Sequence, residues 1–292
     1  MVYLPESRDV VAVIFDFDGT LVPDSITQLL QRHHISPKKF WLRDARDLIR
    51  QGYDQVHAYL NLLLRNIGKN KPLGALTNTD LMKFGSALDD KFYKGIPRVF
   101  HDLQRTGESY DVKLEFYVIS SGLQEMIKGS GIIDKHFNAV YGSQLAGDED
   151  DGVLKYIKRC VTYTEKTRYL FEINKGVRPR HSHRDAVNKD VPMHKRRIPF
   201  SNMCYIGDGL TDIPCFSLVK NGVRGEGGGK AFAVFNPADK SSARRTLQEL
   251  LMPHRVESAH KPSYRPSDEL GSLLRATVAS MCGDVETRRV EA

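Results

Sequence analysis

The chain has 292 residues, with an apolar content of 40% and a charged content of 27%, which are typical of a globular protein. This length is enough for one large domain or for a domain with an inserted one. No apolar run approaches the ~20 residues of a membrane helix, and the charged N-terminal residues are not those of a signal peptide. The cysteines are scattered and form no CxxC pair, so neither a disulfide framework nor a zinc site is indicated: Cys160, Cys204, Cys215 and Cys282. We therefore expect a cytoplasmic protein with no membrane partner.

Short apolar runs suited to buried parallel strands recur along the chain, at 10–15, 114–119, 137–141, 203–206 and 231–235. Helical patterns lie between these runs. Strands that alternate with helices predict a doubly wound, mostly parallel α/β sheet whose strand C-termini form the site.

The gap between the first two predicted strands is too long for one crossover helix, and we expect residues 24–94 to form an inserted helical cap. Apolar residues recur there at the three-to-four spacing of an amphipathic helix: Tyr53, Val56, Tyr59, Leu60, Leu63, Leu64 and Ile67. Thr79 is a plausible N-cap for another helix. The hinges would lie near Val22-Pro23 and Gly95-Ile96-Pro97. Residues 1–23 and 95–256 would then be the core, and 257–292 an extension with one helix that starts at Ser267-Asp268-Glu269.

Two further elements are predicted between the strands at 137–141 and 203–206. The acidic run from Gly147 to Gly152 is expected to be a hairpin tip. Thr164 is the expected N-cap of a helix that contains Lys166 and ends at Gly176.

Two aspartates follow the first predicted strand, in Asp16-Phe17-Asp18-Gly19-Thr20. An ionised carboxylate at Asp16 can attack phosphorus and form an aspartyl-phosphate, which splits one hard step into two easier ones. On an extended segment Asp18 points the same way as Asp16, and it can protonate the leaving alkoxide and then deprotonate water. The alternative is an acidic strand end with an Asp-Gly turn.

A second acidic loop, Gly207-Asp208-Gly209-Leu210-Thr211-Asp212, follows the strand predicted at 203–206. Mg²⁺ prefers a few carboxylates together with waters and phosphate oxygens. Asp16, the backbone carbonyl of Asp18, and Asp208 suit such a shell. Asp212 is expected to orient water or a lysine, and Gly209 lets the backbone come close. The alternative is a glycine-rich turn that caps a helix.

A dianionic phosphate beside carboxylates needs cations and hydrogen-bond donors. Ser120 ends the second predicted strand, and its hydroxyl can hold a phosphoryl oxygen. Lys166 lies in the first turn of its helix, where a lysine works against the helix dipole, which indicates another use. A serine N-cap and a solvated surface lysine are the alternatives, and Lys155, Lys158 and Lys175 are other candidate cations.

These motifs, in this order, resemble the haloacid dehalogenase (HAD) superfamily of phosphohydrolases over residues 10–236. The inserted segment resembles a C1-type cap, and residues 155–167 resemble the phosphoserine-phosphatase-like branch. The resemblance implies a Rossmann-like core with Asp16 as nucleophile, Asp18 as acid and base, and Mg²⁺ as cofactor with Asp208 as a ligand. Ser120 and Lys166 would bind the substrate phosphate, with support from the remaining motif residues, Asp212, Thr20 and Gly209.

Two positions depart from phosphoserine phosphatases. Gly19 stands where a serine is usual, and Ser25 stands where a glutamate usually holds the substrate amine. L-phosphoserine is therefore a doubtful substrate. We expect a Mg²⁺-dependent phosphomonoester hydrolase for a small phosphorylated substrate, with the oligomeric state open. A phosphotransferase or mutase, which passes the phosphoryl group to another hydroxyl, is an alternative of the same chemistry.

Much of the net charge of +7 lies in the segment 177–199, which we expect to be a long exposed loop. Its basic residues can contact polyanions: Arg178, Arg180, His181, His183, Arg184, His194, Lys195, Arg196 and Arg197. Because no aromatic residues are interleaved, base stacking is not supported, and no further metal ligands accompany His181 and His183. A nucleic-acid or acidic-protein binder on a HAD scaffold is therefore a third alternative, beside a merely solvated loop.

Overall fold

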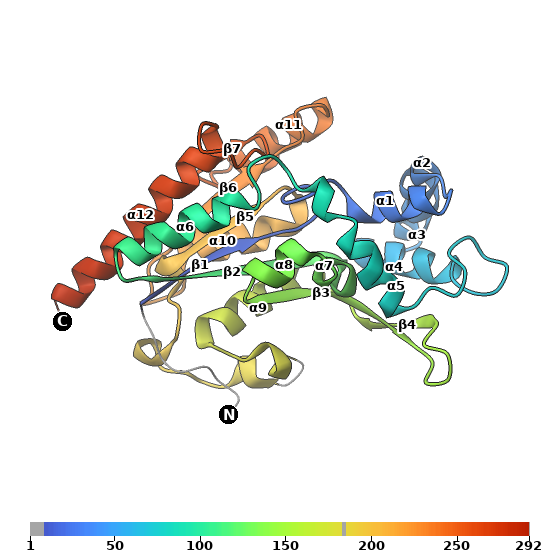
Figure 1. The fold of residues 1–292 in the computed structure, drawn as a ribbon, viewed down its shortest axis with the longest axis horizontal. Coiled ribbons are helices and arrows are strands. Elements are labelled where there is room, and N and C mark those ends of the chain that lie inside the picture. Colours follow the sequence, from blue (N-terminus) through green and yellow to red (C-terminus); the bar gives the residue numbers. More distant parts are fainter. Residues whose placement is uncertain (1–8, 183–184, 292) are drawn as a thin grey trace.

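The computed structural model describes residues 9–182 and 185–291, which form a seven-stranded sheet flanked by helices (Figure 1). The strand order is β4-β3-β2-β1-β5-β6-β7. The strands are β1 (Val10–Phe15), β2 (Lys113–Leu123), β3 (Ala139–Gly147), β4 (Leu154–Arg159), β5 (Met203–Gly207), β6 (Lys230–Val234) and β7 (Ser258–His260). β3 and β4 are antiparallel, and the other neighbouring pairs are parallel. The predicted α/β fold with a mostly parallel sheet is confirmed.

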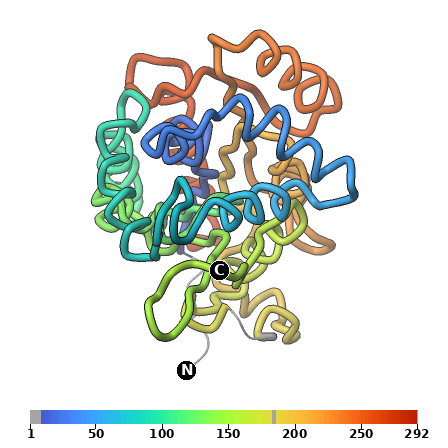
Figure 2. The backbone as a smooth tube through the Cα atoms, turned by 90° about the vertical axis from the view of Figure 1, so that its right-hand side faces the viewer, coloured from blue at the N-terminus to red at the C-terminus, as the bar shows by residue number. Residues whose placement is uncertain are grey.

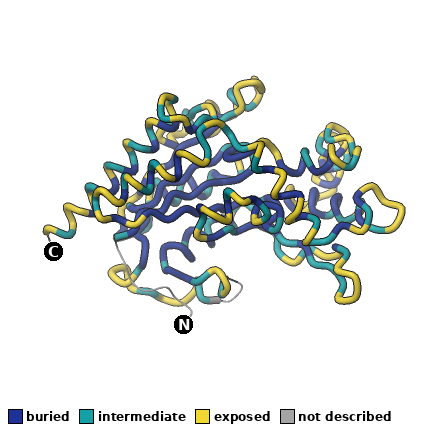
Figure 3. The backbone as a smooth tube through the Cα atoms, in the orientation of Figure 1, coloured by how far each residue is buried: buried dark blue, intermediate teal, exposed yellow. Residues whose placement is uncertain are grey.

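The strand β1 is buried along its whole length, and Figure 3 shows the central strands of the sheet as buried. Its alternate residues point to opposite faces. Val11, Val13 and Phe15 share an apolar cluster with residues of α6 (Arg98–Ser109) and α12 (Glu269–Val290). The other three residues of β1 share a second cluster with residues of α9 (Tyr163–Lys175) and α10 (Ile213–Asn221). Helices on both faces explain why the central strands are continuous apolar runs.

The segment 24–94, which lies between β1 and α6, is largely helical and lies on the right of Figure 1, and Figure 2 looks onto it. Its helices are α1 (Ser25–Arg32), α2 (Pro37–Lys39), α3 (Arg46–Arg50), α4 (Gln55–Arg65) and α5 (Asn78–Ser86). The amphipathic pattern predicted here corresponds to α4, but its end residues Tyr53 and Ile67 lie outside the helix, and Tyr53 is 40% exposed. The prediction of Thr79 as an N-cap is wrong, because Thr77 caps α5. The Thr77 hydroxyl accepts from Asp80 N, and the Asp80 carboxylate accepts from Thr77 N, which is a capping box.

The remaining helices are α7 (Gln124–Lys128), α8 (Gly131–His136) and α11 (Lys240–Thr246). The acidic hairpin tip is confirmed, since β3 and β4 pair on either side of residues 148–153. The predicted N-cap at Thr164 is wrong by two residues, because α9 begins at Tyr163 after Thr162. The helix ends, as predicted, at Gly176, which has the left-handed φ of 72° that favours glycine.

The segment 177–199 differs from the exposed loop predicted for it. Three short 3-10 helices cross it, Pro179–His181, Asp185–Asn188 and Met193–Lys195. The Arg197 side chain is buried, and its guanidinium donates two hydrogen bonds of 2.6 Å to the Glu115 carboxylate on β2. A basic residue in this segment is therefore not necessarily exposed to solvent. Two of the predicted polyanion contacts, His183 and Arg184, lie outside the described residues.

The C-terminal segment packs on the sheet and reaches the predicted catalytic loop. The helix α12 begins at Glu269, as predicted, and packs against α6. Tyr264 is fully buried, and its hydroxyl donates to the carbonyl of Thr20 at 2.8 Å. None of the helices in residues 9–182 and 185–291 has the length and apolar content that a membrane crossing requires.

Candidate active site

The two acidic loops meet at one edge of the sheet. β1 and β5 are adjacent and parallel, so the residues that follow them emerge side by side. The Asp16 amide donates to the carbonyl of Ile206 at 2.9 Å, which holds the first loop against the end of β5. One carboxylate oxygen from each of Asp16, Asp208 and Asp212 lies within 4.8 Å of the others.

The Lys166 side chain crosses between these loops with no solvent exposure. Its Nζ lies 3.0 Å from Oδ1 of Asp16 and 2.7 Å from Oδ1 of Asp212. Tyr205 donates to the same Asp212 oxygen at 2.6 Å, and the Gly209 amide donates to Oδ2 at 3.1 Å. Both oxygens of Asp212 therefore have donors, whereas the described part of the chain supplies no hydrogen bond to the carboxylate of Asp208.

The second aspartate of the first loop faces the end of β2. Asp18 accepts a hydrogen bond of 2.6 Å from the amide of Ser25, the first residue of α1. Gly122 comes so close that a Cβ added there would lie 2.6 Å from Oδ2 of Asp18. The Ser120 hydroxyl oxygen accepts from the Gly122 amide at 2.9 Å, which leaves its own proton free to donate.

A pocket of about 380 Å³ opens above these groups. Five of the eight predicted site residues line it: Asp16, Asp18, Ser120, Lys166 and Asp208. Asp212 and Gly209 lie behind them, in contact through the hydrogen bond described above. Thr20 is buried, and its hydroxyl has no hydrogen-bond partner among the described residues.

Sequence reasoning missed the loop and helix that follow β6. Asn236, Asp239, Ser242 and Arg245 line the same pocket, together with Tyr93 and Asp24. The parallel order of the strands could have indicated this loop. β6 is parallel to β5, so its C-terminal end lies at the same edge of the sheet. The apolar run at 231–235 predicts the strand but not the loop that follows it.

Burial raises the pKa values of the carboxylates in this pocket. Burial raises the pKa of Asp16 to about 6, although Lys166 opposes the shift. Burial and the nearby Asp24 raise the pKa of Asp18 to about 7, and burial with the charges of Asp16 and Asp212 raises the pKa of Asp208 well above its usual value. Burial alone would lower the pKa of Lys166, but the same two carboxylates raise it, so the ammonium stays charged. The single ammonium group of Lys166 offsets only part of the negative charge of these carboxylates. Their surroundings therefore suit a divalent cation.

Residues 13–217 match the family model of the haloacid dehalogenase-like hydrolases. The chain belongs to this family. The predicted membership of the HAD superfamily, and with it the prediction of a hydrolase, is confirmed.

The chain is also similar to other proteins in sequence and in structure. An uncharacterized protein of Borreliella burgdorferi is 29% identical over 239 residues, which cover 74% of this chain and 80% of that protein. The structure of a probable phosphoserine phosphatase from Vibrio cholerae is similar with a TM-score of 0.52 at 10% identity, over 96% of this chain and 68% of that one. The structure of cytosolic 5′-nucleotidase IIIB bound to cytidine is similar with a TM-score of 0.52 at 13% identity, over 96% and 88% of the two chains. At these identities the structures show a shared fold.

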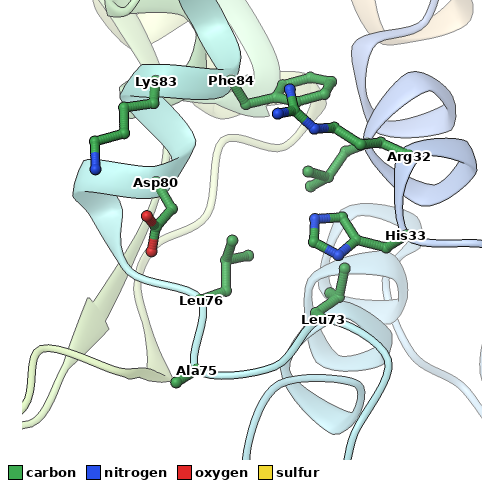
Figure 4. Close-up of a pocket in the computed structure, with 9 residues that line it drawn as sticks. Arg32, His33, Leu73, Ala75, Leu76, Asp80, Lys83 and Phe84 are labelled. Atoms are coloured by element: carbon green, nitrogen blue, oxygen red, sulfur yellow. The ribbon is translucent and has the colours of Figure 1, made fainter.

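The HAD protein has another pocket, of about 370 Å³, between α1 and α5 (Figure 4). Arg32, His33, Asp80 and Lys83 surround an apolar floor, and the Arg32 guanidinium lies 5.6 Å from the ring centre of Phe84. The Asp80 carboxylate is already used in the capping box of α5. No predicted catalytic residue lines this pocket, so the chemistry belongs to the acidic pocket at the sheet edge.

Proposed function

We propose that this HAD protein is a Mg²⁺-dependent phosphatase that hydrolyses small phosphomonoesters through an aspartyl-phosphate on Asp16. One observation carries the proposal: the Asp16 carboxylate lies beside the buried ammonium of Lys166 and lines a pocket together with Asp18, Ser120 and Asp208. The groups that we propose as nucleophile, proton donor and cation would thus act within one small volume.

In the first step, a carboxylate oxygen of Asp16 attacks phosphorus, and the bond between phosphorus and the ester oxygen breaks. Asp18 gives its proton to the leaving oxygen. The pKa of about 7, to which burial raises Asp18, supports this role, because a fraction of the group is protonated at neutral pH.

In the second step, Asp18 takes a proton from a water molecule, and that water attacks the phosphorus of the aspartyl-phosphate. Inorganic phosphate leaves and the Asp16 carboxylate is restored. A phosphotransferase would differ from a phosphatase only in this second step, because the hydroxyl of another molecule would attack the phosphorus in place of water.

Lys166 and Ser120 would hold the phosphoryl oxygens. Lys166 supplies a positive charge from a side chain that has no solvent exposure, so its electrostatic interactions are little screened by water. Ser120 keeps a free hydroxyl proton, because its oxygen accepts from Gly122.

Asp208 is the best candidate metal ligand, because its carboxylate lacks a protein donor in the described chain. Asp16 and the backbone carbonyl of Asp18 would complete the protein share of the shell, while Asp212 keeps Lys166 in place. Bound Mg²⁺ would offset the charge that the carboxylates share with the phosphate.

The helical segment 24–94 would act as a cap over the core formed by residues 1–23 and 95–256. Tyr59 of α4 donates a hydrogen bond to the carbonyl of Ser121, the residue next to Ser120. This contact joins the proposed cap to the end of β2, which carries Ser120. Closure of the cap would exclude bulk water from the aspartyl-phosphate.

We expect a small phosphomonoester as the substrate, because the pocket has a volume of about 380 Å³. Arg245, for which the described residues provide no ion pair, lines the pocket and would contact a second anionic group on the substrate. The names of the two structural neighbours, a probable phosphoserine phosphatase and a 5′-nucleotidase, support phosphomonoester chemistry. The serine at position 25 does not favour L-phosphoserine itself.

A panel of phosphorylated sugars, nucleotides, amino acids and a generic aryl phosphate tests this proposal. We expect phosphate release from at least one of them in Mg²⁺ and its loss in excess chelator. The absence of turnover across the panel would contradict the proposal. Transfer of phosphate to an added alcohol without release into water would favour the phosphotransferase.

A further inference from the structure

Three side chains that could ligate a metal converge near the start of α4, and none of them lines the acidic pocket. Asp54 and His57 lie at the start of α4, and Cys160 follows the last residue of β4. Sγ of Cys160 lies 3.4 Å from Nδ1 of His57, and the same nitrogen lies 3.7 Å from Oδ1 of Asp54. One ligand atom from each residue lies within 4.8 Å of the other two.

We propose that the Asp54–His57–Cys160 cluster is a zinc site that links α4 to the segment after β4. One thiolate, one imidazole and one carboxylate are the ligand types that Zn²⁺ takes in proteins, with water in a fourth position. Bonds of 2.0–2.3 Å in a tetrahedral shell place neighbouring ligand atoms about 3.5 Å apart. The two distances around Nδ1 are close to this separation.

The Cys160 thiol lies within hydrogen-bond distance of Nδ1 of His57, whereas Oδ1 of Asp54, at 3.7 Å, does not. Oδ1 of Asp54 also accepts a hydrogen bond of 2.9 Å from the Val56 amide as the N-cap of α4. A carboxylate has further lone pairs, so a cation can accept electron pairs from all three residues while this cap is kept. The side chains of His57 and Asp54 are 46% and 35% exposed, so a metal ion can enter from solvent.

The cysteine pattern in the sequence did not indicate this site. His57 and Cys160 are 103 residues apart, and only the packing of α4 against β4 brings them together. Formation of the sulfur–zinc bond would release the thiol proton to solvent, and no oxidant or reductant is needed.

The cluster lies at a joint that other contacts already define. Tyr163, at the start of α9, donates to the Gln55 side chain at 2.6 Å, and Tyr59 of α4 donates to the Ser121 carbonyl. Zinc would therefore hold α4 against the core. In an enzyme with a moving cap this restrains opening, a consequence that rests on the proposed function, whereas the zinc site itself does not.

The test uses the full chain, stripped of metal and returned to buffer with excess Mg²⁺ to occupy oxygen-rich sites. Zn²⁺ is titrated by calorimetry, and Co²⁺ by its thiolate charge-transfer absorption. We expect one zinc per chain and the absorption band for wild type, loss of the band in Cys160→Ser, and at least tenfold weaker zinc binding in His57→Ala. His194→Gln, an exposed histidine in the basic segment, is the matched control and should bind like wild type.

A second measurement, amide hydrogen exchange, reports on the link without any assay of turnover. Zinc should slow exchange in α4 of the wild type and leave Cys160→Ser unchanged. The proposed site would be overturned if Cys160→Ser and His57→Ala bound zinc as strongly as the wild type does. A wild-type cobalt complex without a thiolate band would also overturn it. Unchanged exchange in zinc-loaded wild type would overturn the link.

Discussion

The ammonium group of Lys166 lies 3.0 Å from Oδ1 of Asp16, and neither side chain is more than 7% exposed to solvent. The same ammonium lies 2.7 Å from Asp212, which is fully buried. A charge in this environment is retained only while its partners are present. This relationship fixes the position of the proposed nucleophile and keeps its negative charge near a cation.

Replacement of the cation tests this relationship. In Lys166→Met the two carboxylates lose their shared partner, and we expect turnover of a phosphomonoester to fall roughly 10²–10³-fold. Removal of one partner from a buried ion pair also destabilises the protein by about 3–5 kcal/mol, so folding must be checked by circular dichroism. Lys155→Met, on the exposed hairpin, is the matched control. A folded Lys166→Met enzyme with normal turnover would contradict the assigned role.

The two carboxylates of the second acidic loop should behave differently. Asp208 receives no hydrogen bond from the described chain, so Asp208→Asn should retain its stability and need at least tenfold more Mg²⁺ for half-maximal activity. The Asp212 carboxylate accepts hydrogen bonds from Lys166, Tyr205 and Gly209. We therefore expect Asp212→Asn to unfold at a lower denaturant concentration than the wild type. Equal Mg²⁺ dependence in Asp208→Asn and wild type would remove this residue from the metal shell.

Most of the strands were predictable because parallel strands that are buried on both faces have continuous apolar sequences. The strands β1 and β5 are examples. The acids that follow them were predictable as neighbours for the same reason. Lys166 could be selected because its position opposes the helix dipole. These inferences need only local sequence and the rule that parallel strands end at one edge.

Other features depended on contacts between distant residues. Thr77 and Thr79 both have N-cap chemistry, and the reciprocal hydrogen bond from Asp80 decides between them. The burial of Arg197 requires Glu115, which lies 82 residues away. Tyr264 joins the C-terminal segment to the loop of Thr20 through a contact that no periodicity indicates.

The close approach of Gly122 to Asp18 gives a prediction about geometry. A Cβ at this position would lie 2.6 Å from Oδ2 of Asp18, so Gly122→Ala should displace the proposed acid and lower kcat about 10²-fold. Gly227→Ala is the control, because a Cβ there meets no atom within 4 Å. Steady-state kinetics on both variants checks the difference, and an unchanged kcat in Gly122→Ala would show that Asp18 tolerates displacement.

The buried pair of Glu115 and Arg197 predicts a pH dependence of stability. Burial alone would raise the pKa of Glu115, but hydrogen bonds from Arg197 and Tyr117 lower it from 4.5 to about 2. Because the folded-state pKa is the lower one, the carboxylate stabilises the fold above pH 4.5, and this contribution is lost as the pH falls toward 2. The difference corresponds to roughly 3 kcal/mol.

Denaturant unfolding at several pH values tests this pair. Arg197→Met should be less stable than wild type by about 3–5 kcal/mol at neutral pH, and the two curves should converge below pH 4.5. Arg180→Met, an exposed arginine of the same segment, should follow wild type at every pH. A constant gap between wild type and Arg197→Met across this range would exclude the ion pair as its cause.

The proposed nucleophile is tested most directly by phosphate release from an aryl phosphate in Mg²⁺, with wild type, Asp16→Asn and the control Asp150→Asn from the hairpin tip. Asparagine keeps the size of the side chain and removes the attacking charge. We predict turnover in wild type and Asp150→Asn, and a loss of at least about 10³-fold in folded Asp16→Asn. Turnover in Asp16→Asn within a few-fold of wild type would contradict catalysis through an aspartyl-phosphate at this residue.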